Sequence, residues 1–278
     1  MSEQIDRDRI DRDRAVRLLR EEFMEVTRLC ESLDHRHWDL PTCLPGWSVK
    51  DQLAHLIGTE TMLAGGAAPE VEVPDAPHIK NEIGRMNERW VAALRPLSGA
   101  EVLERWREVT SDRLDQLERM TQEDFDAPSW TPAGPDQTYG RFMRIRFLDC
   151  FVHEHDIREA VGAPSRDDDA HLAFVLEEIA SAVGYVVGKK ASAPEGSRIR
   201  LTITGPAARR FDVRVSGRAQ LVDSLDDEPD AEITVPSPLF VRLAAGREEA
   251  GPHIGSTIGI SGDRELAVRV ATNLAYMI

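Results

Sequence analysis

The chain of 278 residues is long enough for one large domain or two ordinary ones, and 41% hydrophobic with 30% charged residues is a globular composition. A formal net charge of −15 would repel a phosphate backbone, which argues against nucleic-acid binding. Apolar runs fall short of the roughly 18 residues that span a bilayer, and the charged N-terminus lacks the apolar core of a signal peptide, so we expect a cytoplasmic protein without a membrane segment.

The N-terminal part of the chain carries the periodicity of helices. Apolar side chains recur every three or four residues, which predicts amphipathic helices that share one core. Ser48 and Asp51 have the spacing of a capping box before the second helix, and Gly162 is expected to end the last one. The predicted helices cover residues 8–34, 49–64, 79–95, 100–121 and 139–161, with proline-rich loops at 37–47, 65–78 and 124–138.

The pattern changes after residue 164. A further helix is followed by segments in which apolar and polar residues alternate, and this alternation is typical of half-buried strands. The fold class expected is therefore α+β overall: an all-α domain over 1–164 and a smaller α+β domain over 165–278. The predicted helices of the second domain cover 167–189, 238–245 and 263–275, and its strands 198–205, 211–217, 231–237 and 253–262.

Asp149 and His153 are the first candidates for a functional site. They are four residues apart on a predicted helix, and this spacing puts both side chains on one face. His55, from the second predicted helix, would add a third nitrogen or oxygen ligand. Three protein ligands with an open position are typical of a catalytic metal site.

Each of these residues also has a simpler explanation. A single histidine near an apolar helix face, such as His55, is more often a hydrogen-bonded core residue. Asp149 stands among apolar neighbours, and a buried carboxylate is costly unless it is paired or bound to a cation. A salt bridge would satisfy it without any metal, and Asp149 with His153 could form a weak ion pair. The candidate partners for the salt bridge are Arg144, Arg146 and Arg158.

The residues after His153 are less suited to bind the same ion. His155 is offset from His153 by about 200° around the helix, and Glu154 also points off that face. Asp156 lies almost one turn further along, where its carboxylate is well placed to accept a hydrogen bond from the His153 ring. We therefore predict a supporting role for Asp156.

The three cysteines do not suggest a disulfide framework. Cys30, Cys43 and Cys150 are odd in number and widely spaced, which fits a reducing cytoplasm. Cys150 follows Asp149 directly and should point about 100° away from it. Its expected role is that of a small buried packing residue.

Two segments of the N-terminal part resemble the DinB-like, mycothiol-dependent maleylpyruvate isomerase family. They are WDLPTCLPGWSVKDQLAHLIGTE at 38–60 and LDCFVHEHDIREAVG at 148–162. The C-terminal segments RLTITGP, PDAEITV and GDRELAVRV are similar to the accessory domain of that family, which is related to sterol-carrier-like (SCP2-like) modules. The resemblance thus covers nearly the whole chain.

The resemblance implies a four-helix bundle with a divalent metal, usually zinc. The ligands would be His55 on helix two with Asp149 and His153 on helix four. The family more often has Glu at the carboxylate position, and Asp149 is one methylene shorter, so the metal could sit differently or bind more weakly. The implied cosubstrate is a low-molecular-weight thiol of the mycothiol type.

The implied activity is that of an isomerase or thiol S-transferase. The metal-activated thiol would add to a small electrophilic acceptor, and the protein would act as a monomer or homodimer. For the pocket we expect Trp47, Trp130 and Tyr139 near the mouth of the bundle. Arg218 and Arg247 of the second domain could bind an acceptor carboxylate.

Two other function classes stay open from the sequence. The protein could be a thiol-independent metal hydrolase that uses bound water as the nucleophile. It could also be a non-enzymatic module that binds a metal or an apolar ligand. A transferase should add the mass of the thiol to its substrate, a hydrolase should work without thiol, and a binding module should keep its ligand after His55→Ala.

Overall fold

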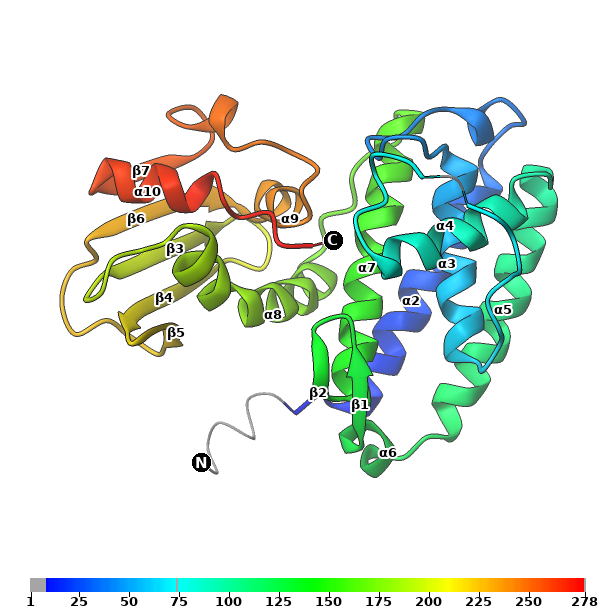
Figure 1. Cartoon of the computed structure of the whole chain (residues 1–278), viewed down its shortest axis with the longest axis horizontal. Helices are drawn as coiled ribbons and strands as arrows, with labels where there is room; N and C mark the ends of the chain where they lie inside the picture. The colour runs from blue at the N-terminus through cyan, green and yellow to red at the C-terminus, as the bar shows by residue number, and fades with distance from the viewer. Residues whose placement is uncertain (1–8, 74, 278) are drawn as a thin grey trace. The chain divides into compact units, whose positions relative to one another are not determined.

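The computed structural model describes residues 9–73 and 75–277, and its contacts divide the chain into two compact units. The units are Met1–Ser165, which is mainly helical, and Arg166–Ile278, which contains a five-stranded sheet (Figure 1). The expected α+β class is confirmed. The start of the first predicted helix, at residue 8, lies outside the described residues.

Long helices make up most of the first unit, and their ends follow from local sequence. Ser48 and Ser98 each form a capping box that begins a helix, whereas Gly162, at φ 68°, ends the last one in the left-handed conformation. The helices are α2 (Arg12–Glu31), α3 (Val49–Leu63), α4 (Glu82–Leu94), α5 (Gly99–Arg119), α6 (Gln122–Asp126) and α7 (Tyr139–Val161), with a short 3-10 turn η1 (His37–Asp39).

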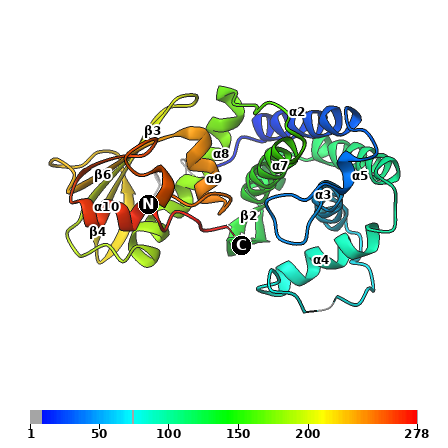
Figure 2. The ribbon, with the colours of Figure 1, turned by 90° about the horizontal axis from the view of Figure 1, so that it is seen from above.

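Four of these helices form a bundle around one core. Helix α2 packs against α5 and α7, and α3 packs against α5 and α7. Helix α4 lies outside the bundle against α3, as both views show (Figures 1 and 2). The apolar residues expected to line the first helix are buried, and Phe23 meets Trp106 of α5 edge to face at 5.3 Å. This packing fixes α3 beside α7.

The prediction of an unbroken loop over 124–138 is wrong. Residues 128–138 form an antiparallel hairpin of β1 (Pro128–Thr131) and β2 (Gly134–Thr138), and the short α6 precedes it. The prolines in this segment suggested a loop, but proline is tolerated at the start of a strand and at its edges. A two-strand hairpin has only edge strands, so its prolines remove few hydrogen bonds.

The second unit is a sheet with strand order β5-β4-β3-β6-β7, in which only the β3–β6 pair is parallel. Three helices pack against its strands. The strands are β3 (Arg198–Thr204), β4 (Arg209–Ser216), β5 (Arg218–Val222), β6 (Ala231–Pro236) and β7 (Gly259–Gly262). The helices are α8 (Asp169–Tyr185), which continues into η2 (Val186–Lys190), then α9 (Ser237–Ala244), η3 (Gly251–His253) and α10 (Arg264–Ala271).

One face of this sheet is apolar. Ile199 and Leu201 of β3 lie opposite Val213 and Phe211 of β4, and all four side chains are buried. Strand β5 was not predicted, because as a mostly exposed edge strand it lacks the apolar alternation. The strand predicted over 253–262 is shorter than expected, since a turn with Gly255 at φ 85° occupies its first part.

Helix α8 with η2, over residues 169–190, is long and apolar enough by composition to cross a membrane. More than half of its most apolar window is buried, and the helix packs against β4, β5 and α9 of its own unit. A core helix of a soluble fold has the same composition, so this helix is explained by the sheet that it covers.

Candidate metal centre

His55 reaches the interior of the bundle because of where α3 begins. The capping box of Ser48 and Asp51 starts the helix after the proline-containing loop, and the imidazole of His55 then lies almost two turns in. His55 as a whole is only 5% exposed. The local sequence thus sets the depth at which this ring enters the core.

Helix α7 brings Asp149 and His153 to the same place. The Nε2 atom of His55 lies 3.1 Å from Asp149 Oδ2, and Nε2 of His153 lies 3.4 Å from Asp149 Oδ1. The two imidazole rings are 4.7 Å apart, centre to centre. The three residues singled out in the sequence are therefore brought together by the fold.

This donor set fits a divalent metal ion. One ligand atom from each of His55, Asp149 and His153 lies within 4.8 Å of the other two, and both imidazoles turn the same kind of nitrogen inward. Two nitrogens and one carboxylate oxygen are ligands that zinc and related ions accept, with room for a fourth ligand. The geometry can therefore hold a metal, and the donor atoms do not decide which one.

The rear of His153 is supported by α3. Its Nδ1 shares a hydrogen bond with Oε1 of Gln52, and the Gln52 amide donates to Thr42 Oγ1 at 2.8 Å. The carboxylate of Asp156 is further from the ring, with Oδ2 at 3.7 Å from Nδ1, and it accepts from the thiol of Cys43 at 3.1 Å. Gln52 therefore holds the position that we expected for Asp156, whose supporting role stays a prediction.

Gln52 was missed in the sequence although a signal was present. It precedes His55 by three residues, so both lie on the same face of α3. An amide one turn from a candidate ligand is a natural partner for the second nitrogen of a neighbouring imidazole. Nδ1 of His55, by contrast, has no hydrogen-bond partner within the part of the chain that the structure describes.

A chain of buried charges leads from Asp149 into the bundle. Arg146 donates to Asp149 Oδ2 through Nη1 and to Glu60 Oε1 through Nε, the latter at 3.0 Å. Glu60 also accepts from Arg113 at 3.1 Å, and Arg113 donates to the hydroxyl of Tyr139 at 2.9 Å. The salt bridge considered as an alternative to metal binding is thus present alongside the metal-ligand arrangement.

These surroundings set the protonation of the centre. Burial alone would raise the pKa of Asp149, but Arg146 and the two imidazoles outweigh it and hold that pKa well below its usual range. Burial lowers the pKa of His55, and the nearby Asp149 only partly offsets this. Burial raises the pKa of the Cys150 thiol. At neutral pH the centre therefore offers an ionised carboxylate and a neutral His55 imidazole, as metal ligation requires.

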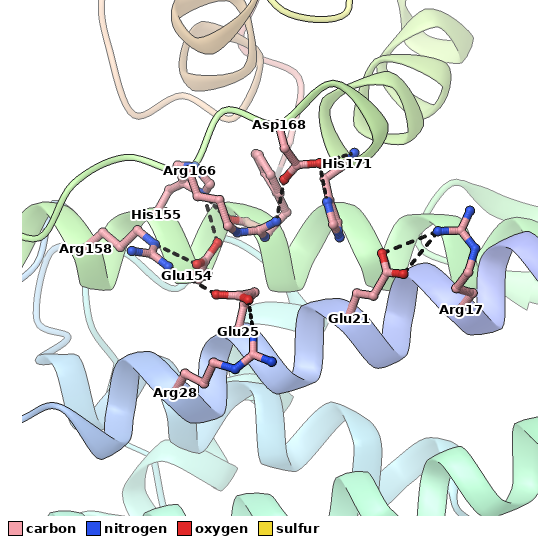
Figure 3. A network of polar contacts seen from close by, with 11 residues as sticks. Arg17, Glu21, Glu25, Arg28, Glu154, His155, Arg158, Arg166, Asp168 and His171 are labelled. Atoms are coloured by element: carbon pink, nitrogen blue, oxygen red, sulfur yellow. Dashed lines mark hydrogen bonds and ion pairs between the residues drawn. The ribbon is translucent and has the colours of Figure 1, made fainter.

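The other charged side chains of this part of α7 have partners elsewhere. Glu154 accepts a hydrogen bond from Arg158, one turn along, at 2.6 Å, and Arg158 also lies 3.7 Å from Glu25 of α2. Figure 3 shows these side chains together. The ring of His155 packs on Phe151 at 4.1 Å, and its Nδ1 lies 2.8 Å from the Phe151 carbonyl oxygen. Glu154 and His155 thus lie away from the centre, as the helical offset predicts.

Trp47 lies beside both candidate histidine ligands. Its ring is 5.3 Å from His55 and 6.1 Å from His153, roughly parallel to the second. The indole N–H donates to Glu88 Oε2 of α4 at 2.8 Å. The same carboxylate lies 3.3 Å from His78 and from Arg95. Through its hydrogen bond with Trp47, Glu88 thus connects α4 to the loop before α3. Trp47 therefore forms an aromatic wall next to the three donor atoms.

The remaining pocket candidates are placed less closely. Tyr139 accepts from Arg113 at the end of the charge chain, and Trp130 is exposed on the β1–β2 hairpin beside Phe142. Arg218 is exposed at the start of β5, and Arg247 donates to the carbonyl of Ala245. Binding of an acceptor carboxylate by Arg218 or Arg247 stays a prediction.

Comparison with known families matches both parts of the sequence. Residues 19–158 match the mycothiol maleylpyruvate isomerase N-terminal domain, and residues 174–269 match the MDMPI C-terminal domain. The first match alone spans half of the chain, and it contains all three donor residues of the candidate centre.

Solved structures and curated proteins give more distant similarities. A crystal structure of a mycothiol-dependent maleylpyruvate isomerase superposes with a TM-score of 0.59 at 17% identity, over 91% of this chain and 93% of that one. A histidine-to-alanine mutant of such an isomerase gives 0.57 at 18% identity over the same shares. Uncharacterized proteins from two strains of Mycobacterium tuberculosis are 27% identical to this chain over 52% of its length. The match spans only about half (55%) of the length of those proteins. At such identities the structural likeness establishes the fold.

Proposed function

The chain belongs to the mycothiol maleylpyruvate isomerase family, and on this basis we propose that it is a metal-dependent enzyme that uses a low-molecular-weight thiol. Mycothiol is the thiol expected from the family, and the acceptor would be a small electrophile. The observation that carries the proposal is the convergence of two imidazole nitrogens and one carboxylate oxygen within 4.8 Å, in a family defined by thiol-dependent chemistry.

His55, Asp149 and His153 would hold the ion, for which zinc is our expectation. A bound divalent ion would favour the thiolate form of the thiol, which is otherwise a minor species at neutral pH. Gln52 fixes the ring of His153 from behind, and Arg146 fixes the carboxylate of Asp149. Trp47 would exclude water from one side of the reacting sulfur.

The proposed reaction is addition of the thiolate to a conjugated alkene. The sulfur forms a bond to one alkene carbon while the π electrons move onto the adjoining carbonyl group. The former double bond then rotates as a single bond, and expulsion of the thiolate restores the alkene as the trans isomer. In an S-transferase the thiol would stay on the product. The free cysteines support a cytoplasmic location for either activity.

Metal content tests the first part of the proposal. Protein purified without chelators or metal-affinity resin should contain close to one equivalent of a divalent metal by elemental mass spectrometry. Asp149→Ala combined with His153→Ala should contain almost none, whereas His155→Ala should match wild type because His155 lies away from the centre. No metal in the wild type, with none taken up on adding zinc, nickel or iron, would contradict the proposal.

Thiol dependence tests the second part. The metal-loaded protein should convert maleylpyruvate to its trans isomer, or join an electrophile to the thiol, only when mycothiol is present. A mass increase equal to the thiol identifies a transferase. Cleavage of a substrate with incorporation of water in thiol-free buffer would identify a hydrolase instead, and ligand binding that survives His55→Ala without turnover would identify a binding module.

A further inference from the structure

Asp149 is shared between the candidate metal ligands and an arginine. Its Oδ2 accepts from Arg146 and also lies 3.1 Å from His55, whereas Oδ1 faces His153 at 3.4 Å. Arg146 precedes Asp149 by three residues, so the two side chains lie almost one turn apart on the same face of α7. The short aspartate side chain stays close to its own helix, within reach of this arginine.

Arg146 has no freedom to leave this position. Its side chain is 3% exposed, and it is held by Glu60 through Nε and by the sulfur of Cys150 through Nη2 at 3.5 Å. Glu60 is in turn fixed by Arg113 from α5. A guanidinium stays protonated at any accessible pH, so a full positive charge is built into the wall of the centre.

The four charged groups of this buried network balance one another without a metal. Glu60 and Asp149 supply two negative charges, and Arg113 and Arg146 supply two positive ones. A divalent ion that arrives at the two imidazoles therefore meets a carboxylate whose charge is largely neutralised by Arg146. It also meets the repulsion of that fixed guanidinium, which the low polarity of the interior strengthens.

We infer that Arg146 is a positioning residue for the metal centre, an inference that rests on the proposed function. It retains Oδ2 of Asp149, so that Oδ1 is the carboxylate oxygen left to serve as a ligand, and the site would hold an ion less tightly than the same three ligands would without the arginine. A carboxylate that uses one oxygen leaves one more position on the ion for the thiol or the acceptor. Nothing else in the proposed reaction calls for a buried arginine here.

Two charge-removing substitutions in the full-length protein should act in opposite directions. Arg146→Gln removes the competing cation, so the affinity for Zn²⁺, measured by chelator competition, should rise roughly tenfold, because the repulsion of a buried unit charge close to the ion is lost. Glu60→Gln keeps an oxygen acceptor for Arg146 but removes the second negative charge that neutralises its guanidinium. The guanidinium then interacts more strongly with Asp149, and the affinity should fall by about the same factor. A merely structural role would weaken binding in both variants, because both disturb packing.

Two further variants serve as controls. Arg146→Lys keeps the charge and should stay within about threefold of wild type, since the repulsion is retained. Arg113→Gln removes a buried cation whose hydrogen bonds go to Glu60, Gln116 and Tyr139 rather than to Asp149, so its effect should be smaller than that of Arg146→Gln. Circular dichroism establishes that each variant is folded. The Co²⁺-loaded form adds a spectroscopic readout: with Oδ2 released in Arg146→Gln, a higher coordination number should weaken the visible absorption.

The outcomes separate this inference from the proposed function. A wild type that binds Zn²⁺, with an Arg146→Gln variant that binds it equally or more weakly, overturns the inference and leaves the proposed function standing. Absence of binding in both overturns the two together. If Arg146→Gln does not fold, Glu60→Gln and Arg113→Gln decide, because they remove charges of opposite sign from the same network. Weaker binding in the first with stronger binding in the second supports the inference, and any other pair of results overturns it.

Discussion

Both units of the protein contain arginine–carboxylate pairs, but they place them differently. In the second unit the pairs lie across neighbouring strands, as with Arg200 of β3 and Asp212 of β4, on the sheet face opposite its apolar residues. In the first unit Glu60, Arg113 and Arg146 lie inside the bundle between α3, α5 and α7. In these sheet pairs the arginine borders solvent, since Arg200 is 18% exposed although Asp212 is buried. In the bundle, Glu60, Arg113 and Arg146 are all enclosed.

The exposure of the side chains makes the difference concrete. Arg198 and Asp230 at the start of the sheet are 29% and 39% exposed, while Arg146 and Glu60 are 3% and 2% exposed. Exposed pairs cost little to form and contribute little to stability. Buried pairs carry a large desolvation cost, and apolar residues of similar volume would often serve stability as well.

The two arrangements also end differently. In the sheet, Arg198 is shared between Asp227 and Asp230, and Asp212 is shared between Arg200 and Arg210, so these charges neutralise one another. The charge chain of the bundle ends at Asp149, where two imidazole nitrogens converge on the same carboxylate. A costly buried network that terminates in metal-type ligands is better explained by function than by stability, and this separates the candidate site from ordinary ion pairs.

Removal of Glu60 should give the largest effect on stability. Glu60→Ala leaves Arg113 and Arg146 buried with one shared partner missing, and the free energy of unfolding should fall by about 3–5 kcal/mol. Urea unfolding followed by circular dichroism at 222 nm measures the change on the helical signal.

The matched control is Asp227→Ala in the second unit. Asp227 is 77% exposed and pairs with Arg198 at 2.8 Å, so its loss should cost about 1 kcal/mol or less. Equal costs for the Glu60 and Asp227 substitutions would mean that the bundle interior is wetter than the packing indicates. The contrast between the two units would then fail.

The stability of the metal-free protein should decrease in acid because of the centre. The pKa of His55 lies below its ordinary 6.5, so below that pH the unfolded chain binds more protons at this site than the folded one. The contribution of His55 to the free energy of unfolding is fully present above about pH 6.5 and is lost as the pH falls. The loss is about 1.4 kcal/mol for each unit by which the pKa of His55 is lower in the folded than in the unfolded protein. Asp149, whose pKa is also lowered, adds a second loss below its ordinary 3.8.

His55→Gln isolates the first of these contributions. Urea unfolding between pH 7 and pH 5, after removal of metal with a chelator, should show a steeper loss in wild type than in the variant. Parallel profiles would mean that His55 titrates in the fold as it does in water. The ring would then be hydrated, and this result would contradict the conclusion that the centre is enclosed.

The three donor residues could be predicted because each has a local signal. Asp149 and His153 follow from helical spacing, and His55 follows from the capped helix and from the family resemblance of its segment. The helices of the bundle were predictable for the same reason, since their apolar periodicity and their caps are encoded within each segment. The departures lie in short or edge elements, namely the β1–β2 hairpin and β5.

The buried charge chain could not be read from the sequence. Glu60 and Arg113 are 53 positions apart, and Glu60 and Arg146 are 86 apart. Of the three arginines considered as partners for Asp149, Arg146 is the one at the i,i+3 spacing on α7. Spacing along a single helix says nothing about which charges of different helices meet, and only the packing of α3 against α5 and α7 supplies Glu60 to hold Arg146.

Trp47 gives the smallest expected effect and tests where the enclosed region ends. Trp47→Phe keeps an aromatic ring beside the imidazoles but removes the hydrogen bond to Glu88, which keeps His78 and Arg95 as neighbours. The free energy of unfolding should fall by about 1 kcal/mol. Affinity for Zn²⁺ should stay unchanged, because the indole supplies no ligand atom; Trp130→Phe on the exposed hairpin should change neither quantity. A marked loss of metal affinity in Trp47→Phe alone would show that the centre depends on its link to α4, so that the functional region extends from the bundle interior to this outer helix.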